Sequence, residues 1–534
     1  MPQFCGPSSK LVLNMNITHL IAAVLALAGT VISFFKYVHI FQLNSYKMPE
    51  QLKWTRTNPG KLLPHWIALI LAVIALLTHR LPFLITEAVL LALFLPAVRP
   101  PKKAKKPLVM TPRVIRLTVT AMLLALIIWQ FSFTAPERIR YCFPCLTFCL
   151  APLLPVTANF INQPIEKSIQ RGFIKDAQRM LRESPNLTVI GITGSYGKTS
   201  VKYFLHTLLK SHFDVLMTPG SFNTPMGVVR TVREQLRPTH EIFLCEMGAR
   251  RAGEIKELCD IAEPTYGILT SIGPQHLETF RTIETIIETK FALADAVEAA
   301  GKGVCFVNCD NELIRNNLGG RTRTVSYGMK SDCAYYADNL RVTHEGTAFD
   351  LHRPDGTVLE NLQTSLIGAH NAVNLAGAIG MALHLGVTEQ EIRIQLRKLT
   401  APPHRLELKR SGNAVIIDDA YNSNPSGSKA ALDALAMFPD CKILITPGMV
   451  ELGEQQDELN AAFGRQAAAV CDYIFLVGEK QAVPIRRGIE EAGFDMNRVT
   501  VTHTVDEAIS QAYAVKTQQR RVILLENDLP DNYL

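Results

Sequence analysis

The first 162 residues consist mainly of apolar runs separated by short basic loops, and these runs set the strongest limit on how the chain folds. An α-helix needs about 20 mostly apolar residues to cross the hydrocarbon layer of a bilayer, and the runs approach that length. The runs cover approximately residues 17–40, 64–79, 82–98, 114–133 and 141–161. The sequence therefore predicts an α-helical membrane region over residues 1–162 with about five transmembrane helices.

Basic residues in the loops predict the orientation of this region. Loop 41–62 carries four lysines or arginines and loop 99–113 carries six, whereas the connection between the second and third runs has only Arg80. Loops rich in lysine and arginine stay in the cytoplasm, so we expect a multi-pass protein of the cell membrane with its N-terminus outside and its catalytic part inside. The alternative is that one short run is re-entrant or interfacial. The net charge of +7 comes largely from these loops, which favours membrane lipid and not nucleic acid as a partner.

Residues 163–184 follow the last apolar run directly and predict an amphipathic helix. The apolar residues at helical spacing are Ile165, Ile169, Phe173, Ile174, Ala177 and Leu181. We expect this helix to pack on the next domain rather than to lie separately on the membrane surface.

The stretch NLTVIGITGSYGKTSVKYFL, residues 186–205, predicts a strand, a glycine-rich turn and the start of a helix. Glycines allow the backbone to wrap closely around phosphate oxygens, and the following helix offers its free N–H groups. In such a loop Lys198 reaches the β- and γ-phosphates of a nucleotide, and the hydroxyl of Thr199 ligates Mg²⁺. The spacing is GxxGxxGK(T/S) rather than the strict GxxxxGK(S/T), and we predict a phosphate-binding loop.

The same stretch resembles the ATP site of the Mur ligase family, whose pattern is GxTGxxGKT(S/T), and further matches extend the resemblance over roughly residues 186–534. Segment 243–255 resembles the family segment in which a strand ends in an Mg²⁺-binding glutamate, here Glu246. Segment 270–280 resembles the segment with a metal-binding histidine, here His276. The Mg²⁺ ligands that the resemblance implies are Thr199, Glu246 and His276, and the ATP-binding residues are Gly194, Ser195, Tyr196, Gly197, Lys198, Thr199, Ser200, Asn371, Asn374, Arg405 and Asp419.

Two more residues follow in the family's order. Lys290 matches the family lysine that becomes carbamylated and helps to hold a second Mg²⁺, although the family has Gly-Glu after it and this chain has Phe-Ala. Asn374 matches the asparagine that meets the adenine. Taken alone, His276 is typical of a hydrogen-bonded loop histidine, Lys290 of a solvated helix lysine and Asn374 of a polar helix face. Their order and spacing favour function, with Lys198, Lys290 and His276 as the catalytic residues.

Eleven cysteines are scattered along the chain. Scattered cysteines in a chain that binds ATP are typical of reduced thiols in the cytosol. Cys142 and Cys145 have the CxxC spacing of a redox site, but no thioredoxin-like strand surrounds them. We interpret this pair as packed or lipid-facing thiols.

The sequence pattern changes after Pro402 and Pro403. These two residues predict a linker, because proline interrupts helices. Beyond them short apolar strands alternate with helical patterns, which indicates a parallel sheet covered on both faces. We expect a central P-loop ATPase domain with a parallel sheet over residues 163–400 and a smaller Rossmann-like C-terminal domain over residues 401–534.

The start of the C-terminal domain resembles the MurF-like branch of the family, through HRLEL at 404–408 and DDAYNSNP at 418–425, with His404 in place of the usual glycine. The match implies that Arg405 and Asp419 reach the nucleotide when the domains close. The alternatives are a turn or helix cap for Asp419 and a surface ion pair for Arg405. The substrate contacts that the resemblance implies are Asn223, Thr224, Tyr421, Asn422 and Asn424.

The reaction that these groups permit forms an amide bond through an acyl phosphate: ATP phosphorylates a carboxylate, and an amine then displaces the phosphate. The resemblance implies that D-Ala-D-Ala, or a similar amine, is added to a small-molecule or lipid-linked cell-wall precursor. Relatives in this branch have an N-terminal domain that grips a uridine nucleotide, and this chain has apolar runs instead. A lipid-linked or anionic-polymer substrate is therefore an alternative, and a non-catalytic ATP-binding membrane scaffold is a second. The sequence predicts no oligomeric state.

Overall fold

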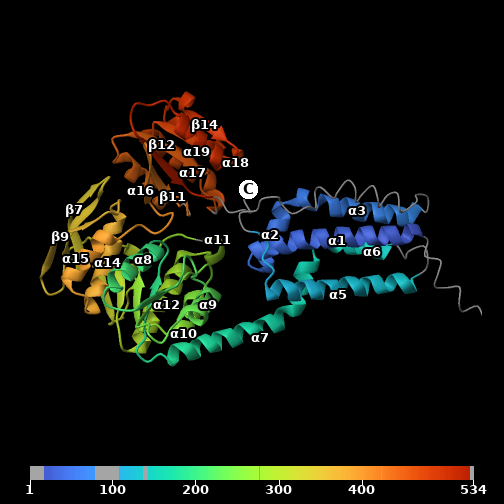
Figure 1. Cartoon of the computed structure of the whole chain (residues 1–534), viewed down its shortest axis with the longest axis horizontal. Coiled ribbons are helices and arrows are strands. Elements are labelled where there is room, and N and C mark those ends of the chain that lie inside the picture. The colour runs from blue at the N-terminus through green and yellow to red at the C-terminus, as the bar shows by residue number, and fades with distance from the viewer. Residues whose placement is uncertain are drawn as a thin grey trace, which may run out of the picture. The chain divides into compact units, whose positions relative to one another are not determined.

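The computed structural model describes residues 17–78, 107–135, 142–275, 277–421, 424–450 and 452–528 (Figure 1). The chain forms two compact units that divide between Arg171 and Gly172. The first unit contains the N-terminal helices, and the second contains two α/β domains, each built on its own sheet.

The first unit is helical throughout its described elements. These are α1 (Ile17–Leu43), α2 (Met48–Thr57), α3 (Pro59–Thr78), α5 (Pro112–Thr134), α6 (Cys142–Leu150) and the first part of α7 (Leu154–Arg182). α1, α5 and α7 share a buried apolar cluster that includes Val38, Leu117 and Ala158. α5 and α7 are also joined by a two-pronged ion pair, in which Arg116 donates to both carboxylate oxygens of Glu166 at 2.6 and 3.0 Å.

The described helices account for part of the predicted membrane region. Two of them are long and apolar enough to cross a membrane: Ala26–Leu43 within α1 and Pro112–Phe131 within α5. Run 64–79 falls in α3, which does not meet the same criterion in its described residues, and run 82–98 lies outside the described residues.

The prediction of a single span over residues 141–161 is wrong. The chain forms a nine-residue helix, α6, then a turn at residues 151–153, and then the separate helix α7. Pro152 lies in this turn. Proline has no backbone N–H to continue a helix, and it disfavours helical geometry in the residue before it, so the apolar run is interrupted there.

The predicted helix over residues 163–184 lies within α7. Ala177 is fully buried and Leu181 is 8% exposed, and both belong to the core of the following α/β domain. The prediction that this helix packs on the next domain is therefore confirmed for its second half, whereas Ile165 and Phe173 of the predicted apolar face are exposed.

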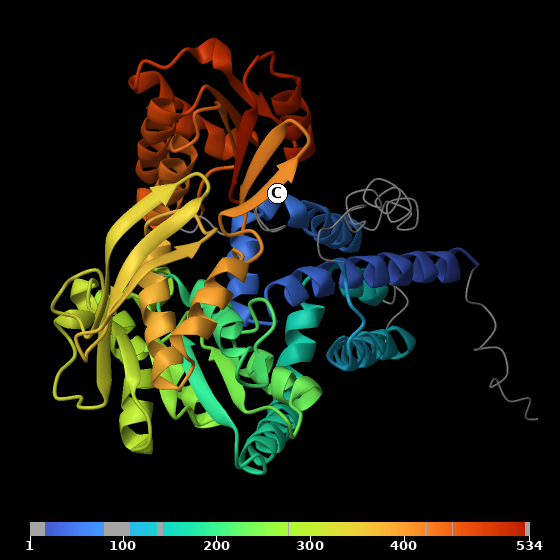
Figure 2. The ribbon, with the colours of Figure 1, turned by 60° about the vertical axis from the view of Figure 1, so that its left-hand side comes forward.

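A nine-stranded sheet forms the centre of the first α/β domain, in the order β2-β3-β1-β4-β5-β6-β7-β8-β9. The strands are β1 (Thr188–Thr193), β2 (Val215–Met217), β3 (Ile242–Glu246), β4 (Tyr266–Leu269), β5 (Cys305–Asn308), β6 (Thr324–Gly328), β7 (Tyr335–Thr343), β8 (Gly346–His352) and β9 (Val358–Thr364). Neighbouring strands from β2 to β7 are parallel, whereas β7, β8 and β9 form an antiparallel meander, seen as the long yellow strands in Figure 2.

Helices cover both faces of this sheet, because side chains alternate along a buried strand. Ile190 and Ile192 of β1 pack with α8, α14 and α15, and Val189 packs in the opposite layer with α7, α9, α10 and α12. The helices are α8 (Lys198–Leu209), α9 (Pro225–Gln235), α10 (Glu254–Ala262), α11 (Leu277–Phe280), α12 (Ile283–Ala300), α13 (Glu312–Arg315), α14 (His370–His384) and α15 (Glu389–Lys398).

The second α/β domain contains a six-stranded sheet in the order β10-β11-β15-β12-β13-β14, in which only β10 is antiparallel to its neighbour. Its elements are β10 (Glu407–Ser411), β11 (Ala414–Asp419), α16 (Pro425–Ala436), β12 (Cys441–Thr446), α17 (Gln456–Val470), β13 (Tyr473–Val477), α18 (Glu479–Glu491), β14 (Val499–Thr502), α19 (Val505–Ala514) and β15 (Arg521–Glu526). Two apolar clusters lie on its two faces. The predicted α/β domain with a parallel sheet is confirmed.

α17 and α18 approach each other closely at a glycine. A Cβ on Gly488 would overlap the carbonyl oxygen of Ala461 on the facing helix. Glycine is the residue that permits this backbone contact.

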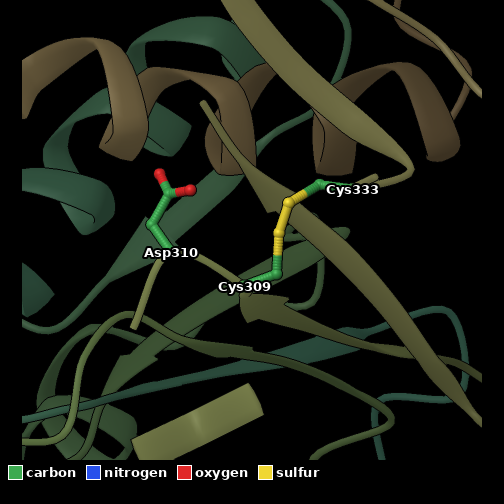
Figure 3. A group of neighbouring side chains, drawn as sticks. All are labelled: Cys309, Asp310 and Cys333. Carbon is green, nitrogen blue, oxygen red and sulfur yellow. A yellow bond between two sulfur atoms is a disulfide. The ribbon is translucent and has the colours of Figure 1, made fainter. Parts of the chain in front are cut away.

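The cysteines differ from the expectation in one place. Cys309 and Cys333 form a disulfide that links the end of β5 to the loop before β7, whereas reduced thiols were expected (Figure 3). The two cysteines stand 24 residues apart, and only the folding of the sheet brings them together. The free cysteines in the described α/β domains, such as Cys245 and Cys305, are buried thiols, as expected.

Candidate active site

The phosphate-binding loop connects β1 to α8, and two glycines give it its shape. Gly194 and Gly197 have φ values of 151° and 83°, which L-residues with side chains rarely adopt. A Cβ on Gly194 would also overlap the hydroxyl of Thr270. The loop is therefore fixed by backbone geometry that the glycine pattern predicts.

The loop is tied to the segment after β4 by hydrogen bonds. Tyr196 N donates to Ser271 Oγ at 2.8 Å, Ser195 Oγ donates to Gly273 O at 3.1 Å, and Gly273 N donates back to Ser195 Oγ at 3.0 Å. Ser195 is 2% exposed. Its hydroxyl therefore holds the loop in place, and the nucleotide contact that the family resemblance implies for Ser195 stays a prediction.

Lys198 begins α8, and its side chain folds back on the loop. Nζ donates to the carbonyl oxygens of Gly194 at 2.6 Å and Ser195 at 2.9 Å. Burial lowers the pKa of Lys198 to about 8. The charge of Glu246 opposes this shift, and the charge of Arg405 adds to it. The ammonium is thus held at the phosphate loop, with Arg405 of the C-terminal domain in electrostatic reach.

Glu246 ends β3 beside the first turn of α8 and is 1% exposed. Its Oε1 accepts hydrogen bonds from Thr199 Oγ1 and Asn223 Nδ2, both at 3.1 Å, and its Oε2 is 2.9 Å from Lys202 Nζ. Burial alone raises the pKa of Glu246, but the charges of Lys202 and Lys198 outweigh it and lower the pKa. The carboxylate is therefore ionised at neutral pH.

These side chains fit Mg²⁺. The Thr199 hydroxyl and the Glu246 carboxylate are hard oxygen donors, they lie 3.1 Å apart, and both face the phosphate loop. Thr199 and Glu246 are the described residues that would hold the ion. His276, the third predicted ligand, lies outside the described residues.

Lys290 lies on α12 and is 2% exposed. Burial, and to a smaller extent the charge of Lys198, lowers its pKa well below the usual value. The surface lysine that the sequence left open as an alternative is therefore excluded, because the side chain is inside the domain. A buried lysine with a depressed pKa is available as a neutral amine.

The two asparagines of α14 differ in position. A Cβ on Gly197 would lie 2.9 Å from Asn374 Oδ1, so the Asn374 amide faces the phosphate loop. Asn371 is buried, and its Nδ2 donates to the carbonyl oxygen of Ile367 at 2.8 Å, which fixes the start of α14. The structure thus brings Asn374, but not the Asn371 amide N–H, to the loop.

The predicted substrate contacts include two helix caps. Thr224 Oγ1 accepts a hydrogen bond from Gly227 N at the start of α9, and Asn424 Oδ1 accepts one from Gly427 N at the start of α16. Asn223, in contrast, contacts Glu246 directly. Asn422 lies outside the described residues.

Arg405, Tyr421 and Asp419 lie at one end of the six-stranded sheet. The Arg405 guanidinium stacks over the ring of Tyr421, 4.5 Å from its centroid. Asp419 Oδ1 accepts a hydrogen bond from Leu406 N at 3.1 Å, and burial raises the pKa of Asp419 to about 6. The Asp419 carboxylate therefore lies at the end of a buried strand, in surroundings that disfavour its ionised form.

His404 replaces the usual family glycine and has a φ of 59°, a left-handed conformation that favours glycine. His404, Glu407 and Asp418 are close enough to one another to suggest a metal site. However, the Lys409 ammonium already contacts both carboxylates, at 3.1 Å from Glu407. The group is an ion-pair cluster next to the linker.

Lys202, four residues after Lys198 on α8, was not among the residues predicted from the sequence. It is fully buried and contacts Glu246. One signal was available: Lys202 stands among Val201, Phe204 and Leu205, on a helix whose other buried positions are apolar. A lysine between such neighbours is rarely left inside a protein unless it is paired.

Two sequence profiles match the second unit. The profile of the Mur ligase middle domain matches residues 192–382, and the profile described as the Mur ligase, glutamate ligase domain matches residues 404–526. Together they cover more than half of the chain, and neither extends before residue 192.

Individual proteins agree with the profiles. The UDP-N-acetylmuramoyl-tripeptide–D-alanyl-D-alanine ligase of Escherichia coli (strain K12) is 28% identical over 347 residues, which are 62% of this chain and 76% of that protein. The ligase of the same name from Bacillus subtilis (strain 168) is 29% identical over 346 residues, 63% of this chain and 72% of that protein. The crystal structure of MurF ligase from Thermotoga maritima in complex with ADP matches with a TM-score of 0.59 at 26% identity, over 67% of this chain and 80% of that chain.

Proposed function

Because this chain belongs to the Mur ligase family of ATP-dependent amide-bond ligases, we propose that it adds D-alanyl-D-alanine, or a similar amine, to a peptide precursor of the cell wall. The names of its relatives from E. coli and B. subtilis support this substrate pair. The MurF structure with ADP supports ATP as the phosphoryl donor. We propose the same domain division as before: residues 1–162, 163–400 and 401–534.

The proposed reaction has two steps. A carboxylate oxygen of the precursor attacks the γ-phosphorus of ATP, ADP leaves, and an acyl phosphate forms. The amine nitrogen then attacks the carbonyl carbon, inorganic phosphate leaves, and the amine releases a proton. Closure of the C-terminal domain excludes the water that would hydrolyse the acyl phosphate.

The residues of the second unit divide this work. The backbone N–H groups of residues 197–200 and the Lys198 ammonium hold the phosphates, so Lys198 exchanges the carbonyls of its own loop for phosphate oxygens. Thr199 and Glu246 would hold Mg²⁺, which would supply positive charge to neutralise the transferring phosphoryl group. Asn374 meets the adenine, Arg405 and Asp419 reach the nucleotide, and Asn223, Tyr421 and Asn422 contact the precursor or its phosphate.

Lys290 and His276 complete the proposed catalytic set. An uncharged lysine amine can attack CO₂ to form a carbamate with release of a proton, and the depressed pKa of Lys290 makes the uncharged amine available. The resulting carbamate carries oxygen ligands for a second Mg²⁺, together with His276.

One observation carries the proposal: the hydroxyl of the phosphate-loop Thr199 lies 3.1 Å from the carboxylate that ends β3. These two oxygens come from segments 47 residues apart, and together they would offer two hard oxygen ligands to the Mg²⁺ of a bound nucleotide.

The proposal predicts that phosphate release by the detergent-purified full chain requires two substrates. With ATP and Mg²⁺, release should need both UDP-N-acetylmuramoyl-tripeptide and D-Ala-D-Ala, and omission of either should reduce it to background. Release that ignores the amine would contradict ligation. Absence of release with both substrates would contradict this substrate pair and favour a lipid-linked or anionic-polymer acceptor. ATP binding without turnover on any acceptor would favour a non-catalytic scaffold.

We also propose that the first unit anchors the protein in the cell membrane, with the ligase domains in the cytoplasm. α5 supports this, because only 17% of its apolar window is buried. The large apolar side chains exposed along α5 are Ile115, Val119, Met122, Leu123, Leu126, Ile127, Phe131 and Phe133. Such a continuous apolar face fits lipid, and this location brings the active site close to lipid-linked precursors.

The membrane proposal predicts that the full chain floats with phospholipid vesicles and that Leu126→Arg reduces the floating fraction at least tenfold. An arginine near the centre of a spanning helix costs about 2.5–3.5 kcal/mol. Ile394→Arg, on an exposed position of α15, is the matched control and should float like the wild type. A wild-type chain that stays dispersed without detergent and does not float would overturn the anchor.

A further inference from the structure

We propose that Lys202 is a positioning residue that sets the geometry of the Mg²⁺ site and of the loop that follows β2. Its side chain is fully buried, and Nζ is 2.9 Å from Glu246 Oε2. Nζ also donates to the carbonyl oxygens of Thr218 at 2.8 Å and Gly220 at 2.6 Å. The ammonium therefore joins three separate segments: α8, the end of β3 and the loop over residues 218–224.

The contacts of Glu246 divide between its two oxygens. Lys202 holds Oε2, whereas Thr199 and Asn223 contact Oε1. A carboxylate fixed through one oxygen presents the other in a constant direction. Lys202 thus leaves Oε1 directed at the Thr199 hydroxyl, the other proposed Mg²⁺ ligand. Outer-shell groups orient metal ligands in this way.

The same ammonium shapes the loop that carries Asn223. Thr218 and Gly220 offer their carbonyls to Lys202, Thr218 Oγ1 accepts from Glu246 N at 3.1 Å, and Gly248 N donates to Asn223 O at 2.8 Å. This loop is consequently tied to Glu246 through Thr218 and to Gly248 through Asn223. Lys198 does not take this place, because its own ammonium donates to the carbonyls of Gly194 and Ser195 in the phosphate loop.

The inference rests on the proposed ATP and Mg²⁺ roles of the site and not on the identity of the acceptor. It predicts that loss of Lys202 affects Mg²⁺-dependent and Mg²⁺-independent nucleotide binding differently. Without Lys202, nucleotide binding that depends on Mg²⁺ weakens, whereas binding through the phosphate loop alone is unchanged. A general loss of structure would weaken both.

The test compares Lys202→Met with wild type in the full chain, by titrating the non-hydrolysable analogue AMP-PNP with and without Mg²⁺. The Mg²⁺ concentration for half-maximal binding should rise at least tenfold in the variant, as is typical for loss of an outer-shell partner. Affinity in EDTA should stay within twofold. Lys210→Met, at the exposed end of the same helix, is the matched control and should change neither value.

Removal of a buried partner can also prevent folding, so Lys202→Gln serves as the second variant. Its amide can still donate to a loop carbonyl but carries no charge for Glu246. Binding of Mn²⁺ to the AMP-PNP complex, measured by electron paramagnetic resonance, should weaken in this variant too. An unchanged metal dependence in either folded variant would overturn the inference, and so would equal losses with and without metal. If the wild-type protein binds AMP-PNP in an Mg²⁺-dependent way but ligates no substrate, only the proposed acceptor is refuted, and the role of Lys202 is unaffected.

Discussion

Replacement of Lys198 by alanine is expected to lower substrate-dependent phosphate release by about 10²–10³-fold, the usual cost of removing one preorganised charge-stabilising donor. The physical reason is that phosphoryl transfer offers the protein little covalent chemistry, so positioning and charge stabilisation supply most of the rate. Lys198 is held at the phosphate loop, and with a pKa of about 8 it is mostly charged at neutral pH.

The measurement is steady-state phosphate release with ATP, Mg²⁺ and both ligation substrates, in the detergent-purified full chain. Lys210→Ala, the exposed lysine at the end of α8, is the control and should keep its activity. AMP-PNP binding to Lys198→Ala should persist in weakened form, because the backbone N–H groups of the loop remain. A variant that retains a third or more of the wild-type rate would show that the phosphate contact is not catalytic.

Much of this site could be predicted because its signals are local. The strand, glycine turn and helix around Lys198 lie within 20 residues, and the two positive-φ glycines are needed whatever the tertiary context. Glu246 was also predictable as the last residue of a buried strand, since ligands gather at the carboxyl ends of parallel strands.

Local sequence signals explain why two of the predicted substrate contacts, Thr224 and Asn424, form helix caps. Thr224-Pro225 and Asn424-Pro425 each place a capping side chain before a proline at the first helical position, a common helix start. The family motif suggested substrate contacts at these positions. The capping hydrogen bonds at α9 and α16 use the same side-chain oxygens, so the sequence already contained the structural explanation.

Long-range pairing explains the rest. The antiparallel meander β7–β9, the Cys309–Cys333 disulfide and the Lys202–Glu246 ion pair each depend on which segments meet after folding. Hydropathy likewise measures how apolar a segment is and not what covers it. Half of the α1 window is buried against other helices, whereas α5 remains largely exposed, so similar runs have different surroundings.

Asp419→Asn is expected to reduce ligase activity about 100-fold and at the same time to stabilise the fold. The loss follows if the carboxylate makes a charged contact during the reaction, since hydrogen bonds to charged groups contribute about 1.5–3 kcal/mol. The gain follows from the pKa of Asp419, which burial raises from 3.8 to about 6. An ionised Asp419 therefore destabilises the native state, and asparagine removes this cost while its Oδ1 can still accept the Leu406 N–H.

The sign of the pH dependence follows from the two pKa values. Above about pH 6 the native Asp419 is ionised at a cost in stability, because burial disfavours the charged carboxylate. Below about pH 4 the carboxyl is protonated in both folded and unfolded states, and the cost disappears. The stabilisation of Asp419→Asn should thus be full at pH 8, decline between pH 6 and pH 4, and be absent below pH 4.

Urea unfolding of both proteins at pH 8 and pH 4 measures the stability difference, and the pH profile of phosphate release measures the functional one. Wild-type activity should fall as the pH drops through about 6, because Asp419 becomes protonated, and this acid limb should be missing in the residual activity of the variant. Asp433→Asn, at an exposed position of α16, is the control for loss of a surface carboxylate. An aspartate retained only for structure would give the opposite pair of results, lower stability at pH 8 with unchanged activity. Stability that rises while activity falls is the result expected of a carboxylate kept buried for its part in the reaction.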